Sequence, residues 1–580
     1  MGSKASAGAS ESRFAARAEA GLRLAPAFTL LVMLGPVAAG ILGTLGPAFG
    51  WLPALGADTP GFATFHALLS EPGIGISIQL SLVTGLAATA ISLAITLLVV
   101  GALQGTRAFG VIERLLSPLL AVPHAAAAFG LAFLIAPSGW IARLLSPWAT
   151  GWERPPDILT AQDPAGLALI AGLVMKEVPF LLLMTLAALG QADARRRRLA
   201  GLCLGYGPIA AWFYGVLPGL YAQIRLPVYA VLAYSMSTVE VAMILGPTTP
   251  APLSVRLVDW MNDPDLGLRL VAAAGAVLQM LLVAAALVLW RLGEIAAARL
   301  GRRLAASGRR FQVDGWLRVS AGVLATLCAA AVILGIAGLA LWSFAGLWRF
   351  PEGLPDTLTL RSWARHGEGL LAPAGNTFVI GIASAAIAAL LAIACLETEY
   401  RYGQRPTSRS LWLLYTPLLV PQTGFLFGLQ ISASAAGFER GLVPVIATHL
   451  VFVLPYVFLS LSGPWRAWDT RQGLAAACLG ASPWRVLLTV RLPMLLAPLL
   501  TAFAVGFAVS VGQYLPTLLI GAGRVATLTT EAVALSAGGD RRLIGLYGLA
   551  QAAAPLPAFA LALALPALLF RHRRGMTVAQ

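Results

Sequence analysis

Two carboxylates and a lysine lie inside long apolar stretches, and their chemistry is the most informative in this sequence. Lys176 and Glu177 are neighbours in one stretch, and Glu240 lies in the next. A charge in hydrocarbon is costly, so such residues usually face a partner or a polar cavity. Successive helical residues point about 100° apart, so Lys176 and Glu177 cannot face one direction. We expect one of them to face a polar path or to pair with Glu240, and an ion pair that only locks two helices together explains them equally well.

Uncharged polar residues extend this set into other apolar stretches. In the later part of the chain, Gln513 and Tyr514 occupy the stretch comparable to that of Glu240. Each such residue by itself is more typical of a hydrogen bond between helices. As a set they predict an asymmetric polar path. Its candidate residues are Lys176, Glu177, Glu240, Gln422, Gln513 and Tyr514.

Catalytic, metal and nucleotide sites are not indicated. A phosphate-binding loop needs a Gly-Lys pair, and the only lysines, Lys4 and Lys176, follow Ser and Met. No H-E-x-x-H motif occurs, and the histidines are too dispersed for a metal cluster. They are His66, His124, His366, His449 and His572. We therefore expect no enzyme activity, no metal and no cofactor bound by this chain.

The composition specifies the elements that must position these residues. Of 580 residues, 58% are hydrophobic and 11% are charged, far from soluble domains, and the mean hydropathy is +0.81. About 20 helical residues cross a bilayer core of about 30 Å, and twelve stretches are long enough. They are 24–48, 75–103, 115–137, 164–189, 222–246, 267–291, 317–346, 374–396, 409–432, 441–463, 494–521 and 544–570. The sequence predicts an all-α polytopic membrane protein with the lipid bilayer around it.

The basic residues predict how the chain is oriented. The net charge of +15 would suggest nucleic acid for a soluble protein, but the arginines lie in short loops, so no nucleic acid is expected. The stretch before residue 24 carries Lys4, Arg13, Arg17 and Arg23, whereas loop 49–74 has no Lys or Arg. Basic residues are retained on the cytoplasmic side. With an even number of spans, both termini are expected in the cytoplasm.

The chain contains an internal repeat. Gly205 and Leu217-Pro218 recur as Gly480 and Leu492-Pro493, at an offset of 275 residues. Two units with an even number of spans share one orientation, which makes them parallel repeats around a shared pathway. The predicted division is a tail 1–23, a six-helix unit 24–292, a basic linker 293–316, a second six-helix unit 317–570 and a tail 571–580.

A spaced motif follows the tenth span and recurs after the fourth. The second copy reads Leu-Ala-Ala-Ala-Cys-Leu-Gly over 474–480, then nine residues, then Val-Arg-Leu-Pro over 490–493. A small-residue helix stopped by glycine and followed by Leu-Pro predicts a short, smooth cytoplasmic hairpin that fits a groove on another protein. The motif positions are Ala200, Gly205, Leu217 and Pro218 in the first copy and Ala475, Ala476, Gly480, Leu492 and Pro493 in the second.

This motif resembles the signature loop of permease subunits of binding-protein-dependent ABC importers, E-A-A-x(3)-G-x(9)-I-x-L-P. The chain is similar to the fused double permeases of ferric-iron and thiamine uptake, and most closely to a thiamine-like branch. The resemblance implies a periplasmic solute-binding protein and two copies of a cytoplasmic ABC ATPase, which holds the ATP and docks on loops 199–218 and 474–493. Leu199 and Leu474 replace the motif's glutamate, and Gly201 replaces its second alanine, so the usual acidic contact is missing.

The main alternative is an ion-coupled secondary transporter, because parallel six-helix repeats also build that class. Such a transporter does not account for two spaced copies of the motif. Acidic Glu240 suits a thiamine-like solute, ferric iron or another small cation.

Overall fold

The computed structural model describes residues 2–190, 193–403 and 407–571, and this part of the chain is almost wholly helical. Among these residues, nine helices are long and apolar enough to cross a membrane, or up to eleven if each of two bent helix pairs counts as one span. The described strands, β1 (Trp51–Leu52) and β2 (Ala57–Asp58), form one small antiparallel hairpin. The predicted all-α membrane architecture is therefore confirmed.

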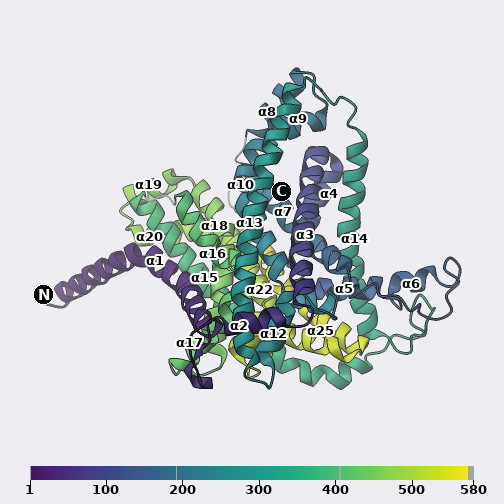
Figure 1. Ribbon diagram of the computed structural model, residues 1–580. Coiled ribbons are helices and arrows are strands. Elements are labelled where there is room, and N and C mark those ends of the chain that lie inside the picture. The colour runs from purple at the N-terminus through teal and green to yellow at the C-terminus, as the bar shows by residue number, and fades with distance from the viewer. Residues whose placement is uncertain (1, 191–192, 404–406, 572–580) are drawn as a thin grey trace.

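Figure 1 labels most of the helices. The first half of the chain forms α1 (Gly2–Ala48), α2 (Ala63–Ser70), α3 (Ile74–Leu103), α4 (Arg107–Ala121), α5 (His124–Ile135), α6 (Trp140–Leu145), α7 (Leu167–Leu189), α8 (Ala194–Cys203), α9 (Pro208–Gly215), α10 (Leu217–Ser237), α11 (Glu240–Leu245), α12 (Leu253–Asn262) and α13 (Leu268–Ala306). The second half forms α14 (Trp316–Phe344), α15 (Arg361–Tyr402), α16 (Ser408–Leu419), α17 (Gln422–Ala435), α18 (Leu442–Ala467), α19 (Thr470–Cys478), α20 (Pro483–Val486), α21 (Leu492–Met494), α22 (Leu496–Val511), α23 (Leu515–Gly521), α24 (Leu528–Leu535), α25 (Arg541–Ala553) and α26 (Leu556–Leu569), with a π-helical turn at Leu487–Arg491.

Proline breaks two of the expected spans. The stretch 409–432 divides into α16 and α17 before Pro421, and 115–137 divides in the same way before Pro123. The residues before these prolines, Val122 and Val420, are extended, with ψ near 125° in both. Proline has no N–H to donate and disfavours a helical residue before it. Twelve spans were expected, but 409–432 is not among the spans that the described residues contain.

Two further expected spans are unwound toward their C-terminal ends. The stretch 222–246 becomes α10 and α11, separated at Thr238, and 494–521 becomes α22 and α23, separated at Gly512–Tyr514. These breaks lie at matching positions of the repeat. Irregular backbone at membrane depth is tolerated where protein buries it or where it lines a cavity. The two breaks therefore mark the interior where a polar path would run.

The first helix of each half packs against the other half. Gly40 and Gly43 of α1 meet the backbone of Phe425 and Gly428 in α17, and a Cβ on either glycine would collide with it. In the matching place α14 crosses α5, where a Cβ on Gly130 would lie 2.8 Å from Gly335 Cα. Glycines allow membrane helices to approach this closely. The two halves are thus interlocked by reciprocal exchange of their first helices.

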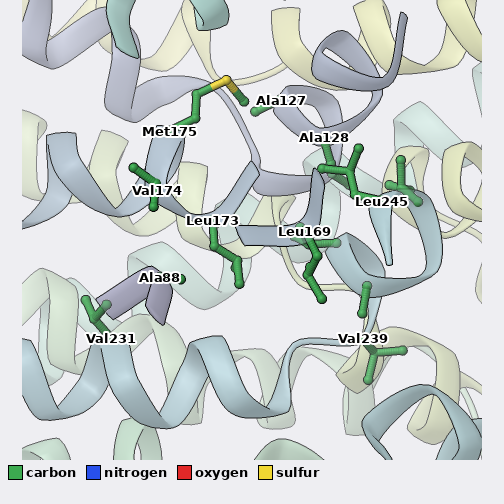
Figure 2. Packing of buried hydrophobic residues seen from close by; sticks show 14 of the residues in the cluster. Ala88, Ala127, Ala128, Leu169, Leu173, Val174, Met175, Val231, Val239 and Leu245 are labelled. Carbon is green, nitrogen blue, oxygen red and sulfur yellow. The ribbon is translucent and has the colours of Figure 1, made fainter. Parts of the chain in front are cut away.

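Equivalent hydrogen bonds recur in both halves. Ser81 Oγ in α3 accepts from the N–H of Leu253 at 3.0 Å, and Thr377 Oγ1 in α15 accepts from the N–H of Leu528 at 3.0 Å. These bonds align α3 with α15 at an offset of 296 residues and repeat the 275-residue offset of the motif. Small and branched side chains fill the space between α3, α5, α7 and α10, as Figure 2 shows for Ala88, Ala128, Leu173 and Val231.

The predicted tails and linker contain more helix than loop. Residues 2–23 of the predicted tail belong to α1, and α13 continues through the linker as far as Ala306, so only 307–315 connect it to α14. The tail 571–580 lies outside the described residues except for Arg571.

Candidate functional site

The two motif copies fold into the same turn. We call residues 194–218 the first coupling loop and residues 470–495 the second. Gly205 and Gly480 have φ of +81° and +82°, the left-handed conformation that glycine adopts without cost. Each glycine N–H donates to the carbonyl three residues earlier, at 2.9 Å in both loops. The next N–H reaches back five residues, from Tyr206 to Gly201 at 3.2 Å and from Ala481 to Ala476 at 3.0 Å. This pair of bonds is the Schellman ending of a helix.

Both loops expose small and apolar side chains, beside the exposed arginines at 195–197 in the first loop and Arg471 and Arg485 in the second. The leucines that replace the motif's glutamate, Leu199 and Leu474, are 51% and 62% exposed. Leu204 and Leu479, which precede the glycines, are also exposed. Of the predicted motif residues, Ala200, Gly205, Pro218, Ala475 and Gly480 are exposed, whereas Leu217, Ala476, Leu492 and Pro493 are half-buried. An exposed apolar surface of this kind is typical of an interaction site.

Each loop is joined directly to a membrane helix. The second segment of the first loop meets α10 at a bend of 63°, and that of the second loop meets α22 at 76°. Figure 1 shows α8 and α9 at the top and α19 and α20 at the upper left, away from α2, α12 and α25 at the bottom. Each loop is therefore continuous with a helix that leads to one of the two breaks.

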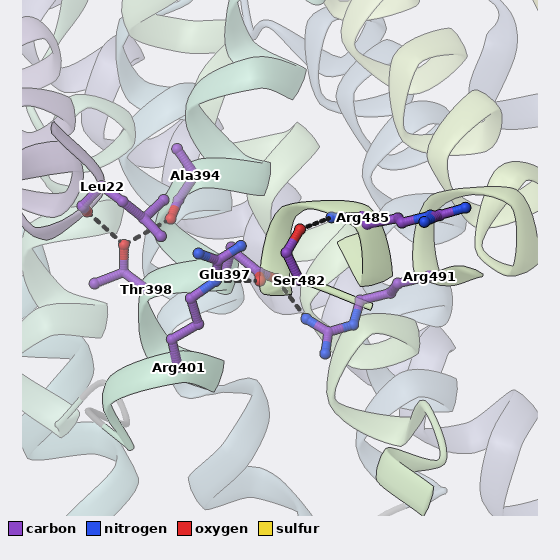
Figure 3. Close-up of polar contacts among 8 residues, drawn as sticks. All are labelled: Leu22, Ala394, Glu397, Thr398, Arg401, Ser482, Arg485 and Arg491. Carbon is purple, nitrogen blue, oxygen red and sulfur yellow. Dashed lines mark hydrogen bonds and ion pairs between the residues drawn. The ribbon is translucent and has the colours of Figure 1, made fainter. Parts of the chain in front are cut away.

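The second coupling loop is anchored by a buried ion pair. Arg491, which is 1% exposed, pairs with Glu397 at the end of α15, and Arg401 Nε donates to the same carboxylate at 2.7 Å (Figure 3). The Arg491 guanidinium also lies 3.5 Å from the ring centre of Tyr400 and 4.2 Å from that of Trp468. Sequence reasoning missed this anchor, since Glu397 and Arg491 are 94 residues apart. The available signal was Glu397 directly after the apolar stretch 374–396, followed by Glu399 and Arg401.

The first coupling loop is anchored by apolar packing at the matching place. Val216 stands where the second loop has Arg491, and Gly101 stands where α15 has Glu397. The fully buried Trp212 fills this space, and a Cβ on Gly101 would lie 2.9 Å from its ring. The two loops therefore share a turn but not an anchor.

The predicted polar residues of α7 have separate partners. Lys176 Nζ donates to the carbonyls of Leu119 at 2.9 Å and Val122 at 2.6 Å, where α4 ends before Pro123. Lys176 therefore bonds to carbonyls that the proline break leaves free and not to Glu240. The expectation that one of Lys176 and Glu177 faces a polar path or pairs with Glu240 stays a prediction. Glu177 instead faces the ring of His124, with Oε1 and Nε2 3.5 Å apart.

Glu240 completes a polar cluster at the break between α10 and α11, in which the two glutamates are buried and the two rings are half-buried. It is the first residue of α11, and its Oε1 accepts from the hydroxyl of Tyr234 at 3.0 Å. The Tyr234 and His124 rings are 4.9 Å apart, which connects Glu240 to Glu177 through two aromatic rings. We call Glu177, His124, Tyr234 and Glu240 the acidic cluster. Sequence reasoning did not single out Tyr234, because the unwound residues between α10 and α11 bring its hydroxyl to Glu240.

The second half contributes to this region through Tyr514, whose hydroxyl lies 3.7 Å from Met243 Sδ in α11. Gln422 begins α17 at the position that His124 has in α5, and Gln513 lies in the break before α23. Within the described part of the chain, no hydrogen bond joins Gln422 or Gln513 to the acidic cluster. The second half has a different polar group, in which His449 contacts Ser510 and Thr517 at 2.8 and 2.9 Å.

The chain is similar to one protein family and to several known permeases. The family described as "Binding-protein-dependent transport system inner membrane component" matches residues 400–572. The inner membrane ABC transporter permease protein YnjC of Escherichia coli K12 is 32% identical over 92% of this chain and 96% of its own length. The spermidine/putrescine transport system permease protein PotC of Escherichia coli K12 is 23% identical over 25% of this chain and 55% of its own length.

A third relative is the putative 2-aminoethylphosphonate transport system permease protein PhnV of Salmonella typhimurium LT2, which is 26% identical over 35% of this chain and 77% of its own length. No solved structure matches the chain. The chain belongs to the binding-protein-dependent ABC transporter permeases of the inner membrane. It is therefore a multi-pass permease and not an enzyme, and its family implies an ATPase and a solute-binding protein as partners.

Proposed function

We propose that this chain forms the complete membrane pathway of an ABC importer, with six-helix units 24–292 and 317–570. Two copies of a separate ATPase dock on loops 199–218 and 474–493 and bind all the ATP that drives transport. Both termini lie in the cytoplasm. The observation that carries this proposal is the repetition of one Schellman turn, with φ near +80° at Gly205 and Gly480, in two exposed loops.

Transport follows from the connection between the loops and the two breaks. When the ATPase closes on ATP, the loops move together and turn α10 and α22 through their bends. These two helices end at Ser237 and Val511, next to the breaks that bring Glu240 and Tyr514 into the interior. ATP binding would thus open the pathway to the periplasmic binding protein, and hydrolysis would return it to the cytoplasmic side.

The acidic cluster favours a small cationic solute. Glu177 and Glu240 are 4% and 7% exposed, and the ammonium of Lys176 is engaged by carbonyls rather than by a carboxylate. A cation that enters this region is attracted by the two carboxylates, and one that carries N–H groups also donates charge-assisted hydrogen bonds, which are among the stronger ones. A thiamine-like solute, ferric iron or another small cation fits this requirement, and the relatives with spermidine/putrescine in their names are consistent with it.

The docking proposal is tested by co-purification with a candidate ABC ATPase of the same organism and by ATP hydrolysis in lipid nanodiscs. Gly205→Val and Gly480→Val should each weaken binding of the ATPase and hydrolysis, because branched residues are strained at positive φ. Asn tolerates this conformation better, so Gly205→Asn and Gly480→Asn are matched controls that keep most of the activity. An active permease that transports without any ATPase would instead establish the secondary transporter.

The substrate proposal is tested by uptake of thiamine, ferric ion and putrescine. Glu240→Gln should lower uptake of the transported cation by about tenfold, since a hydrogen bond to a charged group contributes about 1.5–3 kcal/mol. Hydrolysis of ATP without solute should be unchanged. Glu439→Gln, at an exposed loop position, is the control. Unaltered uptake by Glu240→Gln at a normal protein level would count against the cationic path.

A further inference from the structure

Helix α9 in the first coupling loop begins without a cap of its own. In the second loop, the residue before the helix is Ser482, whose Oγ accepts from the N–H of Arg485 at 3.3 Å. The matching residue in the first loop is Gly207, which has no side chain to accept a hydrogen bond. The first N–H groups of any helix need an acceptor from outside the helix. In the first loop that acceptor must come from elsewhere in the chain.

The acceptor is Asp314, in the short segment that joins α13 to α14. Its Oδ2 accepts from the N–H of Ile209 at 2.6 Å and from that of Ala210 at 3.1 Å. The side chain is 6% exposed, and it lies 105 residues after Ile209 in the sequence. A carboxylate is stabilised at a helix N-terminus by the unpaired N–H groups and by the helix dipole.

The rest of this segment also lies on the first coupling loop. The N–H of Gly207 donates to the Arg310 carbonyl at 3.1 Å, and Gln312 Nε2 donates to the Gly205 carbonyl at 3.3 Å. The ring of Phe311 stacks on Tyr214 with their planes 21° apart. The guanidinium of Arg310 covers the ring of Tyr206 at 4.6 Å. The linker therefore contacts both the turn and the helix of this loop.

The glycine at position 207 is explained by this contact. Its φ is −58°, so its backbone conformation suits any residue. A Cβ there would collide with the Phe311 carbonyl and lie 2.6 Å from Asp314 Oδ2. The residue at position 207 is thus a glycine because the linker occupies the space that the side chain of Ser482 has in the second loop. The absence of a capping side chain at position 207 and the contact with the linker therefore depend on each other, because a side chain at 207 would exclude the linker.

We propose that the linker segment 310–314 is a fixed part of the first ATPase-docking surface, with Asp314 as its positioning residue. This inference rests on the docking proposed above. The ATPase copy at the first loop meets a loop held by α13 and α14 as well as by α10. Since α14 crosses to pack on α5, force applied at the first loop also reaches the helix that joins the two halves. The second loop has Ser482 as its local cap and transmits force through α22 and α15.

The test uses the full-length permease with its ATPase in nanodiscs. Asp314→Ala should lower the rate of ATP hydrolysis about fivefold. The loss of one helix cap shifts the population of the loop by about that factor toward conformations that do not hold the ATPase. Trypsin should also cleave after Arg310 faster in this variant than in the unmodified protein, because the segment no longer lies on the loop. Asp314→Asn keeps an acceptor oxygen and should retain most of both properties. Ser482→Ala is the matched control, which should leave cleavage after Arg310 unchanged.

A double variant distinguishes docking of the linker on the first loop from capping of α9 alone. Asp314→Ala with Gly207→Ser supplies a local cap but excludes the linker from its place. The proposal expects hydrolysis to stay low and the linker to stay open to trypsin. Full recovery of hydrolysis by the double variant, or normal hydrolysis by Asp314→Ala, would overturn it. If Gly205→Val and Gly480→Val leave ATPase binding intact, the docking proposal fails instead, so the two failures are distinguishable.

Discussion

The two coupling loops have the same outer turn and different inner supports. Outside, Gly205 and Gly480 end their helices with the same pair of hydrogen bonds. Inside, the first loop rests on Trp212 and the linker, whereas the second rests on the buried pair of Arg491 and Glu397. The surface that a partner would contact has thus been kept in both copies, while the contacts behind it differ. Different supports for one surface imply different responses to mutation.

The largest effect is expected from Trp212→Ala, which empties the apolar support of the first loop. Removing a fully buried tryptophan typically costs about 3–5 kcal/mol of folding free energy. We expect a loss in this range, measured by thermal unfolding of the purified permease in detergent. Leu487→Ala, at the matching position of the second loop, is the control and should cost less because a smaller side chain is removed. Equal losses would mean that the two supports do not differ as the structure indicates.

The next effect is expected from Glu397→Gln in the second loop. It leaves the buried Arg491 without its counter-charge, and breaking a buried pair in this way typically costs about 3 kcal/mol. Glu397→Gln combined with Arg491→Met should be more stable than Glu397→Gln alone, because no unpaired guanidinium remains. Additive losses in this double-mutant cycle would contradict a direct pairing.

A smaller effect is expected from Gly101→Ala, which tests the apolar support from the opposite side. The added Cβ would press on the Trp212 ring at 2.9 Å, and overpacking of this kind typically costs about 1–3 kcal/mol. Gly101→Ala in the Trp212→Leu background should cost less, since the smaller side chain makes room. The melting temperatures of the four proteins measure this coupling, and a constant cost in both backgrounds would refute the close contact.

The smallest effect is expected from Ser482→Ala. It removes one local cap from the short helix α20, which is worth about 1 kcal/mol. The loss should be confined to the second loop, and hydrogen exchange of the Arg485 amide should quicken while that of Ile209 does not change. Faster exchange at Ile209 as well would show that the two caps are not independent.

Much of the fold could be predicted from apolar length and from the repeat. Within the described part of the chain, nine of the expected spans overlap helices that are long and apolar enough to cross a membrane, with boundaries shifted by a few residues in most cases. The expected span 409–432 is two helices in the structure, because Pro421 breaks this apolar stretch and does not merely bend it. Hydropathy reports the total apolar length and cannot tell one helix from two at an angle.

The sequence also located the two glycine-ended turns, because each turn depends on residues within one short segment. A Schellman ending needs only a helix and a glycine, so the spacing of the motif was sufficient to find it. The acidic cluster was found only in part. Glu177 and Glu240 stood out as charges in apolar stretches, but Tyr234 and the carbonyl partners of Lys176 depend on where helices break and meet.

By itself, the sequence determined that this chain crosses a membrane many times, repeats itself and carries two glycine-ended loops. Those properties are local, since hydrophobicity, spacing and the conformational freedom of glycine act within a few turns of chain. Only the tertiary structure decided that Asp314 caps a helix 105 residues earlier and that Arg491 meets Glu397 across 94 residues. Such pairs are selected by packing of distant helices, and no pattern within either segment encodes the partner.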